Sequence, residues 1–139
     1  MTLVYLGLGS NLGDRAGQLA LARHLLEEAG LRLLRGSSVI ESEPWGVSEQ
    51  PRFLNQVLEA EWDGSPEELL GLVKNVEHRA GRRPRRRWGA REIDVDILLF
   101  GDQRIDRADL QVPHPRMAER DFVLGPLAEL RPDLVHSRA

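Results

Sequence analysis

The chain of 139 residues is long enough for one domain with its own hydrophobic core. With 41% hydrophobic and 29% charged residues, its composition is that of a globular protein and not of a disordered one. The absence of cysteine excludes disulfides, a thiolate nucleophile and cysteine-ligated metals. Without an apolar run near the roughly 18 residues of a membrane span, or a basic leader, we expect a cytoplasmic protein that binds no membrane. The formal net charge of -3 argues against a nucleic-acid partner.

The first half of the chain predicts one helix among three strands. An apolar run at 3–8 is typical of a buried strand, and Asp14 is a candidate cap for a helix over 15–29 that ends at Gly30. A second strand is expected within 31–41, where the pattern is weak. The third strand, at 53–62, has two opposite faces: Leu54, Leu58, Ala60 and Trp62 on one, and Phe53, Asn55 and Val57 on the other.

The second half predicts one more helix and one more strand. Ser65, Pro66 and Glu68 offer a serine cap, a proline in the first turn and a capping-box glutamate for a helix that ends at Gly81. The most regular strand is 92–100, with Ile93, Val95, Ile97 and Leu99 expected on one face and Glu92, Asp94, Asp96, Leu98 and Phe100 on the other. A proline-rich stretch at 112–115 and an apolar segment at 122–130 follow.

The order of these elements predicts the fold. Strand-helix-strand-strand-helix-strand is the ferredoxin-like split βαβ sandwich, an α+β fold with helices packed on an antiparallel sheet. Right-handed crossovers then place the strands in the order fourth, first, third, second. The end of the first strand lies beside the starts of the third and fourth, and residues 42–45 reach the same edge. We therefore expect a single domain, residues 1–139, with four polar segments at one end of its sheet.

Asp94 and Asp96 are a candidate metal site on the last strand. Two residues apart, they share a face, with their Cα atoms roughly 6 to 7 Å from each other. Mg²⁺ prefers oxygen ligands and takes one or two carboxylates together with water and phosphate oxygens. A solvated strand end is the alternative, because Asp-x-Asp is a common sequence.

Arginines cluster immediately before this strand. Residues 79–91 contain seven of them: Arg79, Arg82, Arg83, Arg85, Arg86, Arg87 and Arg91. Guanidinium groups bind phosphate oxygens in a bidentate manner, although a charge run of this kind is also typical of a solvated loop. Beside paired carboxylates, the cluster favours a nucleotide-phosphate site suited to phosphoryl transfer.

An aromatic ring and an amide on one strand face suggest a pocket for a flat heterocycle. Phe53 and Asn55 share that face, and a carboxamide both donates and accepts hydrogen bonds. Trp45 and Phe122 are further aromatic candidates, and ordinary core packing is the alternative for all of them. The glycines of 7–13 match neither a dinucleotide fingerprint nor a P-loop, so we expect them to let a backbone or a ring approach closely.

Four segments carry motifs that occur in order over nearly the whole chain: YLGLGSNLGDR at 5–15, PRFLNQV at 51–57, RWGAREIDVDILLFG at 87–101 and VPHPRMAERDFVLGPLAEL at 112–130. They resemble the 6-hydroxymethyl-7,8-dihydropterin pyrophosphokinase family of folate biosynthesis. The resemblance implies a ferredoxin-like kinase that transfers pyrophosphate from ATP to the hydroxymethyl group of the pterin and releases AMP. It also implies two Mg²⁺ ions, with ATP and the pterin as small-molecule partners. We expect a monomer.

By position, the resemblance also gives roles to individual residues. It implies a catalytic set of Arg82, Arg91, Asp94 and Asp96, in which Asp94 and Asp96 are the ligands of both metal ions. It implies an ATP site made of Glu77, Arg82, Trp88, Arg91, Ile97, His114 and Arg120. It implies a pterin site made of Ser42, Trp45, Phe53, Asn55, Asp94 and Phe122, in which the two phenylalanine rings stack on the substrate.

Two other functions stay open from the residues alone. RNA-binding modules share this strand order, and an arginine-rich loop suits RNA, but they need exposed aromatic residues, and only 5% of this chain is aromatic. A kinase that phosphorylates an unrelated alcohol and releases ADP is the other possibility. Identifying the nucleotide product separates this reaction from pyrophosphate transfer.

Overall fold

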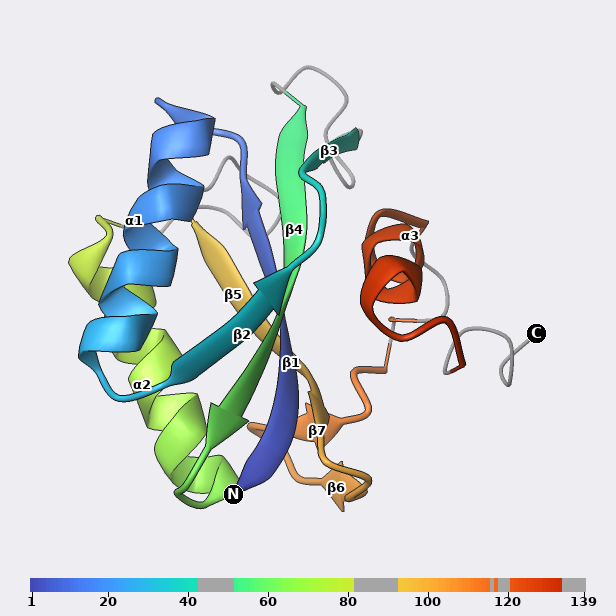
Figure 1. The fold of residues 1–139 in the computed structure, drawn as a ribbon. Coiled ribbons are helices and arrows are strands. Elements are labelled where there is room, and N and C mark those ends of the chain that lie inside the picture. The colour runs from blue at the N-terminus through green and yellow to red at the C-terminus, as the bar shows by residue number, and fades with distance from the viewer. Residues whose placement is uncertain (43–51, 82–92, 116, 118–120, 134–139) are drawn as a thin grey trace.

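One antiparallel sheet organises the chain in the computed structural model, which describes residues 1–42, 52–81, 93–115, 117 and 121–133. Its strands run in the order β2-β4-β1-β5, and β3 also pairs with β4 (Figure 1). The strands are β1 (Thr2–Ser10), β2 (Arg32–Gly36), β3 (Ile40–Ser42), β4 (Phe53–Trp62) and β5 (Asp94–Phe100). This order is the one that the sequence predicted.

Helices lie on both faces of the sheet. Helices α1 (Arg15–Glu28) and α2 (Pro66–Arg79) cover one face, and α3 (Asp121–Leu130) covers the other (Figure 1). A small separate ribbon, β6 (Ile105–Asp106) with β7 (Gln111–Val112), follows β5. The arrangement confirms the predicted α+β fold. None of the helices in the described ranges is both long and apolar enough to cross a lipid bilayer.

Both predicted helix starts are capped as the sequence indicated. The Asp14 carboxylate accepts a hydrogen bond from the Gly17 N–H at 3.0 Å at the start of α1. At α2, the Ser65 hydroxyl accepts from the Glu68 N–H (3.1 Å), and the Glu68 carboxylate accepts from the Ser65 N–H (2.9 Å). Each cap satisfies N–H groups that have no partner within the helix.

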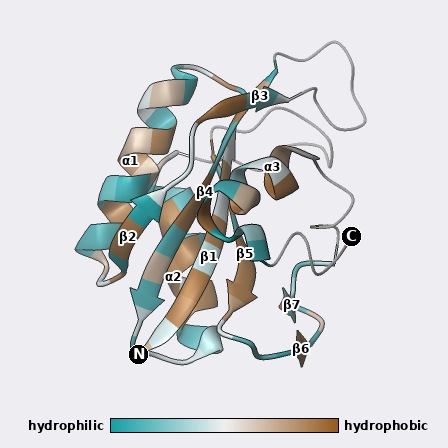
Figure 2. Cartoon of the chain, turned by 45° about the vertical axis from the view of Figure 1, so that its right-hand side comes forward, coloured by the Kyte–Doolittle hydropathy of each residue, from teal (hydrophilic) through white to brown (hydrophobic). Residues whose placement is uncertain are grey.

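The sheet is buried on both faces. On the side of α1 and α2, the strands contribute mainly aliphatic residues, and the alternating hydropathy of α1 in Figure 2 is that of a helix with one buried side. On the side of α3, a second cluster joins strand residues to the helix: Tyr5, Val57, Leu98, Leu99, Val123, Leu127 and Leu130. The predicted faces of β4 are confirmed, since Leu54, Leu58, Ala60 and Trp62 pack in the first cluster and Val57 packs in the second.

The alternation predicted for the last strand is wrong beyond Ile97. Leu6 pairs with Ile97 and Tyr5 pairs with Leu99, so Leu98 is an extra residue in a β-bulge. As a result Leu98 and Leu99 both pack on the α3 side, while Phe100 packs on the side of α1 and α2. Since all of these residues are apolar, the sequence pattern gave no sign of the bulge.

The single strand predicted within 31–41 is also wrong, because two strands occupy this range. Between β2 and β3, the Ser37 N–H donates to the Val57 carbonyl (2.8 Å) and the Ser37 hydroxyl accepts from the Val57 N–H (2.9 Å). A side-chain oxygen thus takes the place of a backbone acceptor beside β4, and the regular ladder is interrupted. The apolar segment at 122–130, whose pattern predicted no particular secondary structure, forms most of α3.

We expect Ser65→Ala to lower the free energy of unfolding by about 1 kcal/mol, because it removes the hydroxyl that caps α2. Urea denaturation followed by circular dichroism measures the effect. Ser65→Asp is the matched control, since aspartate is also a good N-terminal cap. Equal losses in the two variants would contradict the capping role.

Candidate active site

Three residues on neighbouring strands form one row across the α3-covered face of the sheet. In the antiparallel ladders, Gly9 of β1 pairs with Asn55 of β4 on one side and with Asp94 of β5 on the other. Asn55 and Asp94 are two strand spacings apart, so their Cα atoms are separated by about 10 Å. Gly9 carries no side chain, so no side chain of β1 fills the row between the carboxamide and the carboxylate. We call this gap over Gly9 the hollow.

The Asn55 carboxamide is fixed in place at one side of this hollow. The side chain is almost fully buried, and its Nδ2 donates to the Ser42 hydroxyl at 2.8 Å and more weakly to the Ile40 carbonyl at 3.4 Å. Its Oδ1 lies 3.3 Å from the position that a Cβ on Gly9 would take, and the Phe53 ring lies 3.4 Å from the same point. The structure therefore brings together Ser42, Phe53 and Asn55, three of the residues predicted for the pterin site.

The two predicted metal ligands lie on the same face. Asp94 is half-buried and Asp96 is exposed, and Asp96 pairs with Gly7 as Asp94 pairs with Gly9. Neither glycine carries a side chain between the strands, although the Leu98 side chain lies 3.5 Å from a Cβ placed on Gly7. Within the described residues, no group of three or more potential metal-ligating side chains is present. Two carboxylates on one strand face fit Mg²⁺, which fills its remaining positions with water and phosphate oxygens.

A pocket of about 290 Å³ lies at the outer edge of β5. Its walls come from three parts of the chain that are distant in sequence: α2, β5 and the segment 108–115. The lining residues with polar or charged side chains are Lys74, Glu77, Asp96, Asp109, Gln111 and His114. Three residues predicted for the ATP site, Glu77, Ile97 and His114, therefore line one pocket together with the predicted metal ligand Asp96.

Two of these lining residues are held against β5 by hydrogen bonds. The Glu77 carboxylate accepts the Val95 N–H at 2.8 Å and so links α2 to the edge strand. The His114 N–H donates to the Leu98 carbonyl at 3.0 Å, which fixes the segment after β7 beside the same strand. Ile97 is buried in the core and contributes apolar wall.

Of the remaining predicted site residues, Phe122 lies within the described ranges. Phe122 lies in the first turn of α3, half-buried against the cluster that α3 forms with the sheet. Residues outside the described ranges are Trp45, Arg82, Trp88, Arg91 and Arg120.

Arg15 is a residue that sequence reasoning missed. Its Nη1 donates to the Glu41 carboxylate (2.9 Å) and to the Arg52 carbonyl (2.8 Å). It thus ties the start of α1 to β3 and to the residue before β4, the two segments that carry Ser42 and Phe53. The sequence held no periodic or spacing signal for this contact, because its partners are 26 and 37 residues away.

Comparison with known proteins identifies the family. The sequence model described as 7,8-dihydro-6-hydroxymethylpterin-pyrophosphokinase (HPPK) matches residues 5–132. The chain belongs to this family. Membership confirms the family that the motifs resembled and, with it, the expected enzymatic reaction of the HPPK family, pyrophosphoryl transfer in folate biosynthesis.

Individual relatives agree with this placement. The 2-amino-4-hydroxy-6-hydroxymethyldihydropteridine pyrophosphokinase of Aquifex aeolicus is 48% identical over 136 residues, which are 98% of this chain and 84% of the relative. The protein of the same name from Bacillus subtilis is 45% identical over 92% of this chain and 77% of its own length. The mitochondrial folate synthesis bifunctional protein of Arabidopsis thaliana is 40% identical over 91% of this chain, but the match spans 23% of that longer protein.

Solved structures support the fold. A crystal structure of Plasmodium falciparum HPPK-DHPS with SDX-DHP superimposes with a TM-score of 0.71 at 15% sequence identity, covering 95% of this chain and 40% of that one. The complex of the same protein with pteroate gives a TM-score of 0.70 at 16% identity over 91% of this chain and 38% of that one. At such low identity the similarity concerns the fold alone.

We expect Gly9→Ala to raise the KM for the pterin about tenfold, because the added methyl group enters the hollow and crowds the Asn55 carboxamide and the Phe53 ring. Gly7→Ala is the matched control on the same strand and face, since its methyl group meets only the Leu98 side chain at an ordinary 3.5 Å. Steady-state kinetics with varied pterin measures both. The prediction is wrong if the Gly9 variant keeps the parental KM.

Proposed function

We propose that the HPPK reaction takes place where the Gly9 hollow meets the pocket at the edge of β5. There the chain transfers the pyrophosphoryl group of ATP to the hydroxymethyl group of 6-hydroxymethyl-7,8-dihydropterin and releases AMP. The observation that carries the proposal is the position of the carboxylate pair. Asp94 belongs to the row of Asn55 and Gly9, while Asp96, two residues further along β5, lines the pocket.

The pterin occupies the hollow in this proposal. A flat two-ring system lies over Gly9, where the absent side chain lets it approach the sheet. The Asn55 carboxamide, oriented by Ser42, offers its Oδ1 to a donor on the ring. Phe53 provides one aromatic face. We assign Phe122 and Trp45 to the opposite side by their resemblance to the family motif.

The nucleotide occupies the pocket at the β5 edge. Leu70, Val73 and Ile97 supply apolar wall for a base, and His114 and Lys74 supply donors for ribose or phosphate oxygens. Several lining groups are carboxylates, so the triphosphate needs additional positive charge. We assign that role to Arg82, Arg91 and Arg120, with Trp88 beside them, on the basis of the family motif.

Two Mg²⁺ ions are the cofactors that we propose for Asp94 and Asp96. When bound, they neutralise phosphate charge and so make the β-phosphorus accessible to an oxygen nucleophile. The residues of the chain bind and orient the two substrates. The new bond joins the hydroxymethyl oxygen to the β-phosphorus, and the bond from that phosphorus to the oxygen of the α-phosphate breaks. The electron pair of the broken bond stays with AMP, and the proton of the hydroxymethyl group passes to solvent.

One chain supplies both substrate sites in this proposal. We therefore expect the active form to be a monomer. We place it in the cytoplasm, where both small-molecule substrates are available, and expect no nucleic acid or membrane partner.

The direct test is incubation of the purified chain with ATP, Mg²⁺ and the reduced pterin, followed by nucleotide analysis. We expect AMP in equimolar amount with the pterin pyrophosphate. ADP as the product would indicate single phosphoryl transfer and would contradict the proposal. RNA retention at moderate salt without AMP formation would favour the RNA-binding alternative.

We expect Asp96→Asn to lower kcat by several orders of magnitude while the circular dichroism spectrum and pterin affinity stay near their parental values. The substitution removes the charge that holds the metal but keeps the size of an exposed side chain. Asp102→Asn, in the exposed turn after β5, is the matched control and should retain full activity. Parental turnover in the Asp96 variant would remove the basis of the metal assignment.

A further inference from the structure

Glu59 is a carboxylate buried in the middle of β4, outside the site described above. Only 7% of the residue is exposed, so its charge needs compensation. Arg35 of β2 provides it with two parallel hydrogen bonds, Nε to Oε1 and Nη2 to Oε2, each of 2.9 Å. The Tyr5 hydroxyl of β1 donates to Oε2 as well. The Arg35 guanidinium holds the pKa of Glu59 below its usual range, against the opposite effect of burial, so the pair is ionised at neutral pH.

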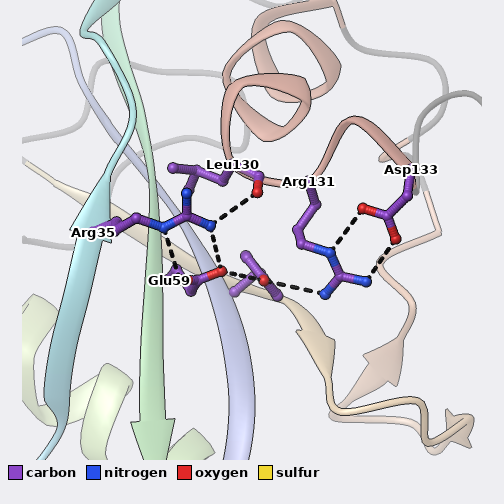
Figure 3. A network of polar contacts seen from close by, with 6 residues as sticks. Arg35, Glu59, Leu130, Arg131 and Asp133 are labelled. Carbon is purple, nitrogen blue, oxygen red and sulfur yellow. Dashed lines mark hydrogen bonds and ion pairs between the residues drawn. The ribbon is translucent and has the colours of Figure 1, made fainter.

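The same groups continue to the end of α3. Arg35 Nη2 also donates to the Leu130 carbonyl at 2.9 Å, and Arg131 Nη1 donates to the Tyr5 hydroxyl at 3.2 Å (Figure 3). Arg131 is itself oriented by Asp133, which accepts two hydrogen bonds of 2.9 and 2.8 Å from it. Since the last carbonyls of a helix have no partner within the helix, Arg35 satisfies one of them.

A second pair of hydrogen bonds joins the same end of α3 to the segment between β2 and β3. The Glu129 carboxylate accepts from the Ser38 N–H at 3.0 Å and from the Ser38 hydroxyl at 2.7 Å. Ser38 lies shortly before β3, and β3 carries the Ser42 hydroxyl that orients Asn55. The polar contacts at the end of α3 are therefore made to β2, to β1 and to the segment between β2 and β3. Of these, β1 carries Gly9, and the Ser38 segment leads into β3.

These contacts supply what the apolar packing of α3 lacks. The helix has only ten residues, and Val123, Leu127 and Leu130 pack on aliphatic and aromatic side chains through non-directional contacts. The hydrogen bonds from Arg35 to the Leu130 carbonyl and from Arg131 to the Tyr5 hydroxyl are directional, and they fix how the end of the helix lies on the sheet. Phe122 lies eight residues before Leu130, about 12 Å along the same helix.

We propose that the network of Glu59, Arg35, Tyr5 and Arg131 is a positioning element of the reaction, which sets the affinity for the pterin by fixing α3 and its Phe122 over the hollow. The inference rests on the proposed function, because it takes the hollow to be the pterin site. None of the four residues touches the substrate, so all are positioning residues. The alternative is a purely structural role, in which the network affects stability alone.

The test must remove the hydrogen bonds of the network without leaving the buried Glu59 carboxylate unpaired. Arg35→Met with Glu59→Leu does this, because it removes the buried Glu59 charge together with its partner, whose own side chain is half exposed. Tyr5→Phe is a second, milder variant that keeps the Arg35–Glu59 pair and removes the hydroxyl that donates to Glu59 and accepts from Arg131. Arg32→Met is the matched control, since Arg32 is an exposed arginine on the same strand as Arg35.

Steady-state kinetics and pterin titration in the presence of a non-hydrolysable ATP analogue give the readouts. We expect the double variant to raise the KM and Kd for the pterin about tenfold, with the KM for ATP changed less than twofold. Tyr5→Phe should raise the pterin KM about threefold, and Arg32→Met should leave both constants unchanged. A selective effect on one substrate is not expected from a general loss of stability.

Three results would overturn the proposal. The first is a double variant that folds and keeps the parental KM for the pterin. The second is an equal rise in the KM for ATP and the pterin, which would indicate a general disturbance of the domain. The third is a double variant that does not fold, together with a Tyr5→Phe variant of parental kinetics. The proposed function is tested separately, because it is wrong if the parental chain forms no AMP. If the parental chain forms AMP and the double variant has parental pterin constants, only the positioning role is wrong.

Discussion

The antiparallel pairing of β1 with both β4 and β5 is the constraint on which the site depends. Because β1 runs opposite to both neighbours, the end of one central strand meets the beginnings of two others. That pairing places Gly9 between Asn55 and Asp94. A shift of the register by one residue on either side would turn one of these polar side chains to the opposite face of the sheet. Burial of both faces opposes such a shift, so the core fixes the geometry of the site.

The position of β5 at the edge of the sheet explains where the pocket forms. An edge strand has one side without a neighbouring strand, and here α2 and the segment 108–115 stand beside it and enclose the pocket. The hydrogen bond from the Val95 N–H to Glu77 satisfies an edge donor that would otherwise be open to pairing. The hollow therefore lies on the α3-covered face of β5, and the pocket lies along its outer edge. In the proposed site, Asp94 and Asp96 would therefore lie between the pterin and the nucleotide.

Much of this arrangement was predictable because it depends on local signals and strand order. Short stretches of sequence were enough to predict the capping box of Ser65 and Glu68, the alternation of β4 and the shared face of Asp94 and Asp96. The convergence of Asn55 with Asp94 follows from the strand order alone. Contacts between distant residues were not predictable in the same way. Arg35 and Glu59 are 24 residues apart, and in the sequence each is an unremarkable charge within a strand. The bulge at Leu98 was hidden because every neighbouring residue is apolar.

The side chains beside Gly7 and Gly9 give the face of β1 two different surroundings. The Leu98 side chain lies 3.5 Å from a Cβ placed on Gly7, whereas Asn55 Oδ1 and the Phe53 ring lie 3.3 and 3.4 Å from a Cβ placed on Gly9. The surroundings thus change from polar and aromatic at Gly9 to aliphatic at Gly7, two residues back along the strand. In the proposed site, a ring system over Gly9 would meet an aliphatic boundary in that direction.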